Sequence, residues 1–163
     1  MINKLHLAMI ELYSGDAKRI QHFCKVHSYA KLIAETENVD EKCLFIIEAA
    51  ALTHDIGIHL CEEKYGNCNG KLQEKEGPAI AEKLLAKLGF DRDISDRVQY
   101  LIAHHHTYSN IDGIDYQILV EADFLVNIME DGLSKEAALK AYESIFKTTC
   151  GKMICREMFD FCS

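Results

Sequence analysis

Histidine and aspartate residues occur in this sequence in a combination that is suited to holding a metal ion. Of the eight histidines, three are consecutive, at positions 104–106, and His54 directly precedes Asp55. His22 and Asp123 each lie on the apolar face of a predicted helix, where a polar side chain needs a partner. Any one of these residues alone would be expected to be a hydrogen-bonded polar group. Together, imidazoles and carboxylates from three helices predict a site for a divalent transition metal.

The helices that carry these residues are predicted by apolar side chains that recur with a period near 3.6 residues. Asp16, Asp40 and Ser134 are suited to cap the amino ends of three of them. We therefore expect an all-α fold, a single compact helical bundle domain over residues 1–163, with a core at about 16–127 and C-terminal helices over 134–161 that pack on it. The expected helices cover residues 2–13, 16–36, 40–53, 77–88, 95–105 and 115–129, followed by two that begin near 134 and 149.

Two connecting segments are predicted to be loops. Residues 58–70 are polar and contain glycine, which indicates a long irregular loop, and residues 107–113 form the other. Pro78 is expected in the first turn of the helix over 77–88, where its missing N–H is tolerated.

The composition excludes several classes of protein. The chain has 163 residues, of which 48% are hydrophobic and 27% charged, with one proline and nine glycines. These values exclude a disordered or collagen-like chain, and we expect no apolar run long enough to span a membrane. The formal charge is −8 and no run of Lys or Arg occurs, so no binding of duplex nucleic acid is expected.

The cysteines and the amino-terminal segment indicate in which cellular compartment the protein is expected. Seven cysteines include no Cys-x-x-Cys pair, which disfavours a structural zinc knuckle and predicts mostly buried or unreactive thiols. The first residues lead into an amphipathic stretch that lacks the apolar core of a signal peptide. We therefore expect a cytoplasmic protein.

Three stretches of the sequence resemble the HD-domain superfamily of metal-dependent phosphohydrolases. They are Arg-Ile-Gln-His-Phe-Cys-Lys-Val at 19–26, Ala-Ala-Ala-Leu-Thr-His-Asp-Ile-Gly at 49–57 and Leu-Val-Glu-Ala-Asp-Phe-Leu at 119–125. The strongest motif is Leu-Thr-His-Asp-Ile-Gly. The resemblance implies a helical domain whose metal is held by His22, His54, Asp55 and Asp123.

The first histidine of this set has two candidates, His22 and His27. The spacing in the family places a Val four residues after the histidine and an Ala four residues beyond that, which matches Val26 and Ala30. We therefore choose His22 as the ligand and interpret His27 as a polar neighbour.

Some members of the superfamily hold a second metal with further histidines. The family's Ile-x-x-His spacing from Ile102 selects His105 at one of these positions. His104 and His106 point elsewhere on a helix, although one of them could join the site where the helix frays.

The other second-metal position, four residues before a glycine, holds Gln73. An amide binds a transition metal more weakly than imidazole does. We therefore expect one tightly bound ion (Fe, Mn, Co, Ni or Zn) and a second that binds weakly or not at all. Glu74 and Glu76 are candidates for the missing donor, or else solvated acids of a first helical turn.

The resemblance implies hydrolysis of a small phosphate ester, with a nucleotide as the favoured substrate. Asp55 and Glu76 are candidates to orient or deprotonate the attacking water. Arg19, one turn before the first ligand, is the candidate to bind the phosphate. Lys64 and Lys71 lie near the expected mouth of the site, but solvated surface positions explain them more simply.

Two other classes of function remain open. One is an oxygenase with two irons, as some HD-like sites are, which needs the complete second set of ligands. The other is a regulatory module that binds a metal or a nucleotide without turnover, against which the intact His54-Asp55 pair and Asp123 argue.

Overall fold

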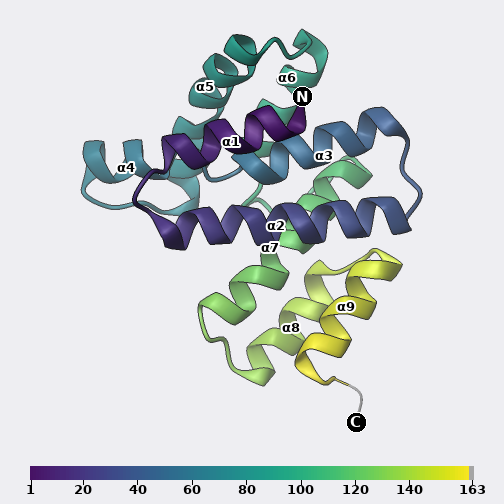
Figure 1. The fold of residues 1–163 in the computed structure, drawn as a ribbon. Helices are drawn as coiled ribbons and strands as arrows, with labels where there is room; N and C mark the ends of the chain where they lie inside the picture. Colours follow the sequence, from purple (N-terminus) through teal and green to yellow (C-terminus); the bar gives the residue numbers. More distant parts are fainter. Residues whose placement is uncertain (162–163) are drawn as a thin grey trace.

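Helices account for all the regular structure in residues 1–161, the part of the chain that the computed structural model describes (Figure 1). This confirms the predicted all-α fold, and Cys162 lies outside the described residues. The helices are α1 (Ile2–Leu12), α2 (Ala17–Thr36), α3 (Glu41–Thr53), α4 (Ile58–Tyr65), α5 (Gly70–Leu88), α6 (Arg92–Ile102), α7 (Ile114–Glu130), α8 (Lys135–Ile145) and α9 (Thr149–Phe159).

Helix α7 lies at the centre of the packing. It packs against α2 and α3, and α3 also contacts α1 and α6. Helices α5 and α6 form a hairpin on one side of this core, and α8 and α9 form another on the opposite side, as Figure 1 shows. Almost every side chain of α7 between residues 115 and 128 is buried, so its acidic residues lie in the interior and need partners there.

The helix starts predicted at the three capping residues are confirmed. Each capping side chain accepts a hydrogen bond from the backbone N–H three residues further on, which satisfies a donor that the helix itself leaves free. The pairs are Asp16 with Arg19, Asp40 with Cys43 and Ser134 with Ala137.

Residues 58–70 are not the irregular loop that their polar composition suggested. Ile58–Tyr65 form α4, because Ile58 and Cys61, one turn apart, are buried while the polar residues after them face solvent. Gly66, with a φ of +70°, then ends the helix in the left-handed conformation that glycine favours. Only a short connection therefore separates α4 from α5.

Helix α5 likewise begins earlier than predicted. Asn69 caps it by accepting a hydrogen bond from the Leu72 N–H at 3.1 Å. Pro78 thus lies inside the helix and not in its first turn. Because proline has no N–H, it cannot donate to the Glu74 carbonyl one turn before it. The additional turns bring Gln73 and Glu74 next to residue 106, where an irregular loop would not have held them.

The segment Glu41–Tyr65, which comprises α3, the turn at 54–57 and α4, corrects another expectation. Its length and composition suit a membrane span, although we expected no such run. However, 67% of its most apolar window is buried inside the domain. Its apolar side chains therefore have protein partners, and we interpret the segment as the core of the helical fold.

The C-terminal helices are attached to α7 through the buried carboxylate of Glu121. It accepts hydrogen bonds from the backbone N–H of Lys147 at 2.6 Å and of Thr148 at 2.9 Å, and also from the Thr148 hydroxyl and the Gln117 amide. A Cβ at Gly151 would overlap this carboxylate, so the close approach requires glycine. The linker between α8 and α9 is thus docked by charge-assisted hydrogen bonds.

Glu121→Ala should lower the free energy of unfolding by about 3 kcal/mol, because it leaves buried N–H groups without an acceptor and opens a cavity. Urea unfolding followed by circular dichroism measures the change. Glu143→Ala removes an exposed carboxylate from α8 and is the control, with an expected change below about 0.5 kcal/mol. Equal stability of the Glu121→Ala protein and its parent would contradict this account of the linker.

Candidate metal centre

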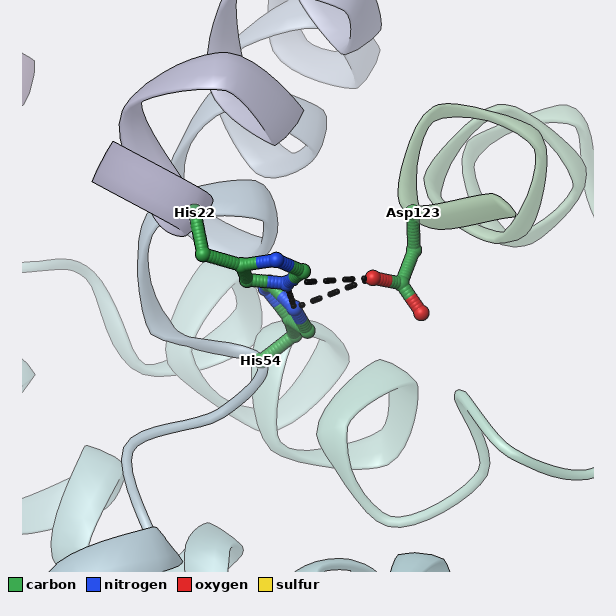
Figure 2. Close-up of side chains that lie close together, drawn as sticks. All are labelled: His22, His54 and Asp123. Atoms are coloured by element: carbon green, nitrogen blue, oxygen red, sulfur yellow. Dashed lines mark hydrogen bonds and ion pairs between the residues drawn. The ribbon is translucent and has the colours of Figure 1, made fainter. Parts of the chain in front are cut away.

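Side chains from three helices meet in the interior, as Figure 2 shows. His22 comes from α2, His54 directly follows α3, and Asp123 comes from α7. The Nε2 atom of His22 lies 3.2 Å from Nε2 of His54 and 3.3 Å from Oδ1 of Asp123. The Nε2 atom of His54 lies 3.5 Å from the same oxygen. Three potential donor atoms therefore face one small region.

The opposite nitrogen of each imidazole is held by a hydrogen-bond acceptor. Nδ1 of His54 lies 2.9 Å from the Ala51 carbonyl, and Nδ1 of His22 lies 2.9 Å from the Glu130 carboxylate. Since these acceptors carry no proton to give, Nδ1–H donates in each case, and the lone pair of the neutral ring is left on Nε2. Metal-ligating histidines are oriented in the same way.

A second group of possible ligands, formed by Asp55, His105 and His106, lies beside the first. Oδ1 of Asp55 is 3.5 Å from Nε2 of His105, while its Oδ2 is 3.5 Å from Nε2 of both histidines of the first group. Nδ1 of His105 donates to the Ile102 carbonyl at 2.7 Å, so its lone pair is also on Nε2. The carboxylate of Asp55 therefore faces both groups, with one oxygen toward each.

Two buried atoms of these groups, Nε2 of His105 and Oδ1 of Asp123, have no hydrogen-bond partner within the described residues. His105 has no exposed surface, and Asp123 is only 3% exposed. A buried acceptor without a partner is costly, and such atoms are rare in folded proteins. A cation bound in each group would satisfy the lone pair of that group, so both sets of donors fit a metal ion.

The electrostatics of the cluster also favour a cation. Burial disfavours the imidazolium forms, but Asp55 and Asp123 raise the pKa of His54 to about 9 and that of His22 above its ordinary value. Against the opposite effect of burial, His22 and His54 hold the pKa of Asp123 well below its usual range, and His54 and His105 lower the pKa of Asp55 to about 2. The carboxylates thus attract positive charge, which a metal ion would supply in place of protons.

Both the sequence and the fold match known proteins. A family model described as HD domain matches residues 19–146. The chain belongs to the HD domain family. Its fold is similar to the crystal structure of a predicted HD superfamily hydrolase from an uncultured Thermotogales bacterium, with a TM-score of 0.70 and 25% sequence identity over 98% of this chain and 85% of that chain. No curated protein matches the chain.

In this HD domain, His27, the candidate that we did not choose as the first metal ligand, lies outside the cluster. Nε2 of His27 instead lies 3.0 Å from the carboxylate of Glu48. Among the three consecutive histidines, His104 also faces away, since its Nδ1 donates to the Tyr100 carbonyl at 2.7 Å and its ring stacks on the tyrosine. The structure therefore brings His22 and His105 to the cluster, and neither His27 nor His104.

Gln73 and Glu74 hold the turn that carries His106. The side-chain oxygen of Gln73 accepts a hydrogen bond from Nε2 of His106. Glu74 accepts from the His106 backbone N–H and from the Thr107 hydroxyl, both at 3.0 Å. Burial and the neighbouring His105 lower the pKa of His106 to about 4, so this ring is neutral at pH 7. A metal at His106 must therefore use Nδ1 or compete with Gln73.

Glu76, one of the two candidates to orient the water, faces α4. Its carboxylate accepts hydrogen bonds from the Tyr65 hydroxyl at 2.6 Å and the Lys64 ammonium at 3.0 Å, and these partners keep the pKa of Glu76 below its usual range. The structure therefore does not bring Glu76 together with the His/Asp cluster. The position of Lys64 is explained by this ion pair.

A polar cavity of about 500 Å³ opens beside the cluster. Arg19 lies at this cavity, as predicted, but its guanidinium donates to Asp16 and Glu62, each at 2.5 Å. An incoming phosphate must therefore compete with two carboxylates for Arg19. The cavity is lined by Lys18, Arg19, Gln73, Asn127 and Asp131, together with His22, Asp55 and Glu130 of the cluster and its surroundings.

The turn at 54–57 is positioned by two contacts that sequence reasoning missed. The Tyr13 hydroxyl, from the end of α1, donates to the Asp55 carbonyl at 2.7 Å. A Cβ at Gly57 would lie 3.0 Å from the Gly77 nitrogen, so the glycine lets α5 approach the turn closely. These contacts hold the Asp55 backbone between α1 and α5.

Glu130 is a further functional residue that sequence reasoning missed. It lies seven residues after Asp123, two helical turns along α7, and this spacing is a signal that places both on one face. One oxygen accepts from Nδ1 of His22 and the other from the Lys25 ammonium at 2.7 Å. Glu130 therefore fixes the orientation of the His22 ring.

Glu130→Gln should weaken metal binding by about 10- to 100-fold, because the carboxylate that orients His22 and increases its basicity is lost. Competition with a chromogenic chelator, using Zn²⁺ or Co²⁺, measures the affinity. Glu48→Gln is the matched control, since it alters a His–Glu pair outside the cluster. Equal affinity of the Glu130→Gln protein and the control would rule out this role.

Proposed function

We propose that this HD domain is a metal-dependent phosphohydrolase that acts on a small phosphate ester, with a nucleotide as the favoured substrate. The observation that carries the proposal is that imidazole nitrogens and carboxylate oxygens converge in the interior. Two of these atoms, Nε2 of His105 and Oδ1 of Asp123, are buried without a hydrogen-bond partner within the described residues. The predicted hydrolase of similar fold supports the reaction class.

His22, His54 and Asp123, with Asp55 beside them, are the residues that would hold the first ion. When bound, such an ion supplies a Lewis acid for a phosphoryl oxygen and lowers the pKa of a water molecule. Fe, Mn, Co, Ni and Zn all suit a mixed set of imidazoles and carboxylates.

Asp55 is the residue of this set that the substrate side can reach. Its side chain is 21% exposed and lines the cavity, whereas that of Asp123 is 5% exposed. An ionised carboxylate in this position can accept a proton from water and hold the water in line with the phosphate. We therefore propose that Asp55, and not Glu76, orients or deprotonates the attacking water, because Glu76 faces α4.

The phosphate would be held by cations at the cavity. Lys18 and Arg19 line it, and both follow Asp16 in the first turn of α2. Arg19 can offer two parallel N–H donors to a phosphate once one of its carboxylate partners is displaced. Its contribution to affinity is therefore smaller than that of an unpaired guanidinium.

A second ion would draw on Asp55, His105 and His106. We propose that it binds more weakly than the first, since His106 is engaged with Gln73 and the position that Gln73 occupies supplies no imidazole. The presence of this second group also keeps the alternative of a two-iron oxygenase open, and the metal content of the protein distinguishes the two functions.

His54→Ala should abolish metal retention and phosphate release while the α-helical circular dichroism spectrum stays unchanged, because a central ligand is lost. The measurements are metal per chain after dialysis and phosphate released from a panel of nucleotides and sugar phosphates. His27→Ala is the matched control and should retain both. Activity in the His54→Ala protein would reject the site. Iron with oxygen consumption and no phosphate release in the parent would favour the oxygenase.

Gln73→His should raise the metal content of dialysed protein from about one to about two ions per chain, because imidazole replaces a weak amide donor. Metal analysis by mass spectrometry measures the change. Gln73→Asn, which keeps an amide, is the control and should leave the content unchanged. Two tightly held ions in the unmodified protein would contradict the proposed weakness of the second site.

A further inference from the structure

Three basic side chains gather at a groove of the C-terminal hairpin. Lys152 and Arg156 lie one turn apart on the same face of α9, and Lys147 lies in the linker before it. They line a cavity of about 410 Å³ together with Thr149, Met153 and Tyr142 of α8. All three cations are exposed, so their ammonium and guanidinium groups are accessible to a ligand.

The charge of this groove is opposite to that of the whole chain. The protein has a formal charge of −8, yet no acidic residue occurs between Lys147 and Arg156, and none lines the groove. Within the described residues, neither lysine forms an ion pair, and Arg156 approaches only its neighbour Glu157, at 3.7 Å. The cations are therefore available to an external anion.

At the amino end of α9, the backbone donors of Cys150 and Gly151 are already taken by acceptors within the protein. The Thr148 hydroxyl accepts from the Gly151 N–H at 2.9 Å, and the Glu37 carboxylate accepts from the Cys150 N–H at 2.7 Å. The buried Glu121 fixes the backbone of Lys147 and Thr148. The basic side chains thus project from a well-anchored backbone, which lowers the entropic cost of binding.

We propose that this groove binds an oligophosphate, a chain of two or three phosphates, either free or as part of a nucleotide. Three cations along one groove match the several charges of such a chain, and a guanidinium can donate two hydrogen bonds to one phosphate. The half-buried Tyr142 ring and Met153, which is 45% exposed, offer an apolar contact for a nucleotide base. The α8–α9 hairpin, whose residues line the groove, lies on the side of α7 away from α5 and α6 (Figure 1).

The test is isothermal titration of chelator-treated, dialysed protein with sodium tripolyphosphate and with a non-hydrolysable nucleoside triphosphate. One ligand should bind per chain, with an affinity that falls as salt rises. K152A/R156A should weaken binding at least about tenfold, since it removes two charge-assisted contacts. The matched control K135A/K140A removes two exposed lysines from α8 and the same total charge, and should bind like the parent.

The His54→Ala protein separates this proposal from the proposed function. Unchanged oligophosphate binding in that variant supports the groove, whereas loss of binding assigns the ligand to the cavity beside the His/Asp cluster and overturns the proposal. Equal losses in the two double variants, or no binding by the parent, would also overturn it. If the nucleotide binds more tightly than tripolyphosphate, and Tyr142→Ala weakens the binding of the nucleotide alone, the ligand is a nucleotide. Equal affinities for the two ligands would identify the free oligophosphate.

Discussion

A carboxylate buried at the centre of the fold, Asp123 of α7, imposes the main constraint on this protein. A charge that is almost removed from water is costly unless a cation or hydrogen-bond donors surround it. The imidazole of His22 faces it from α2 and that of His54 from the residue that follows α3, and both helices pack on α7. The need to give the buried charge of Asp123 partners therefore affects both how the central helices pack and which residues form the site.

Other acidic side chains of α7 contact different parts of the molecule. Glu121 lies two residues before Asp123, and this spacing turns it toward the linker that carries α9. Glu130 lies two turns after Asp123 and orients the His22 ring. Helix α7 thus connects the His/Asp cluster with the C-terminal hairpin, so loss of its packing would affect both.

The second ligand group is controlled by hydrogen bonds that its neighbours make. Gln73 holds the His106 ring and Glu74 holds the backbone of the same residue, both from the first turns of α5. His105, one position earlier, leaves its Nε2 free toward Asp55. The availability of this group to a metal ion therefore depends on side chains of α5 as well as on the consecutive histidines, because an amide that binds an imidazole competes with a metal for that ring.

The sequence by itself determined the all-α class, the capped helix starts at Asp16, Asp40 and Ser134, and, through the family motif, the set that includes His22 and His54. Capping and the helical period are local rules, so they can be read from neighbouring residues. The same rules failed at 58–78, because α4 buries only a few side chains and its polar surface resembles a loop. Only the tertiary structure decided the roles of Glu130 and Gln73, since their partners lie 108 and 33 residues away in the chain and no periodicity or spacing links positions so far apart.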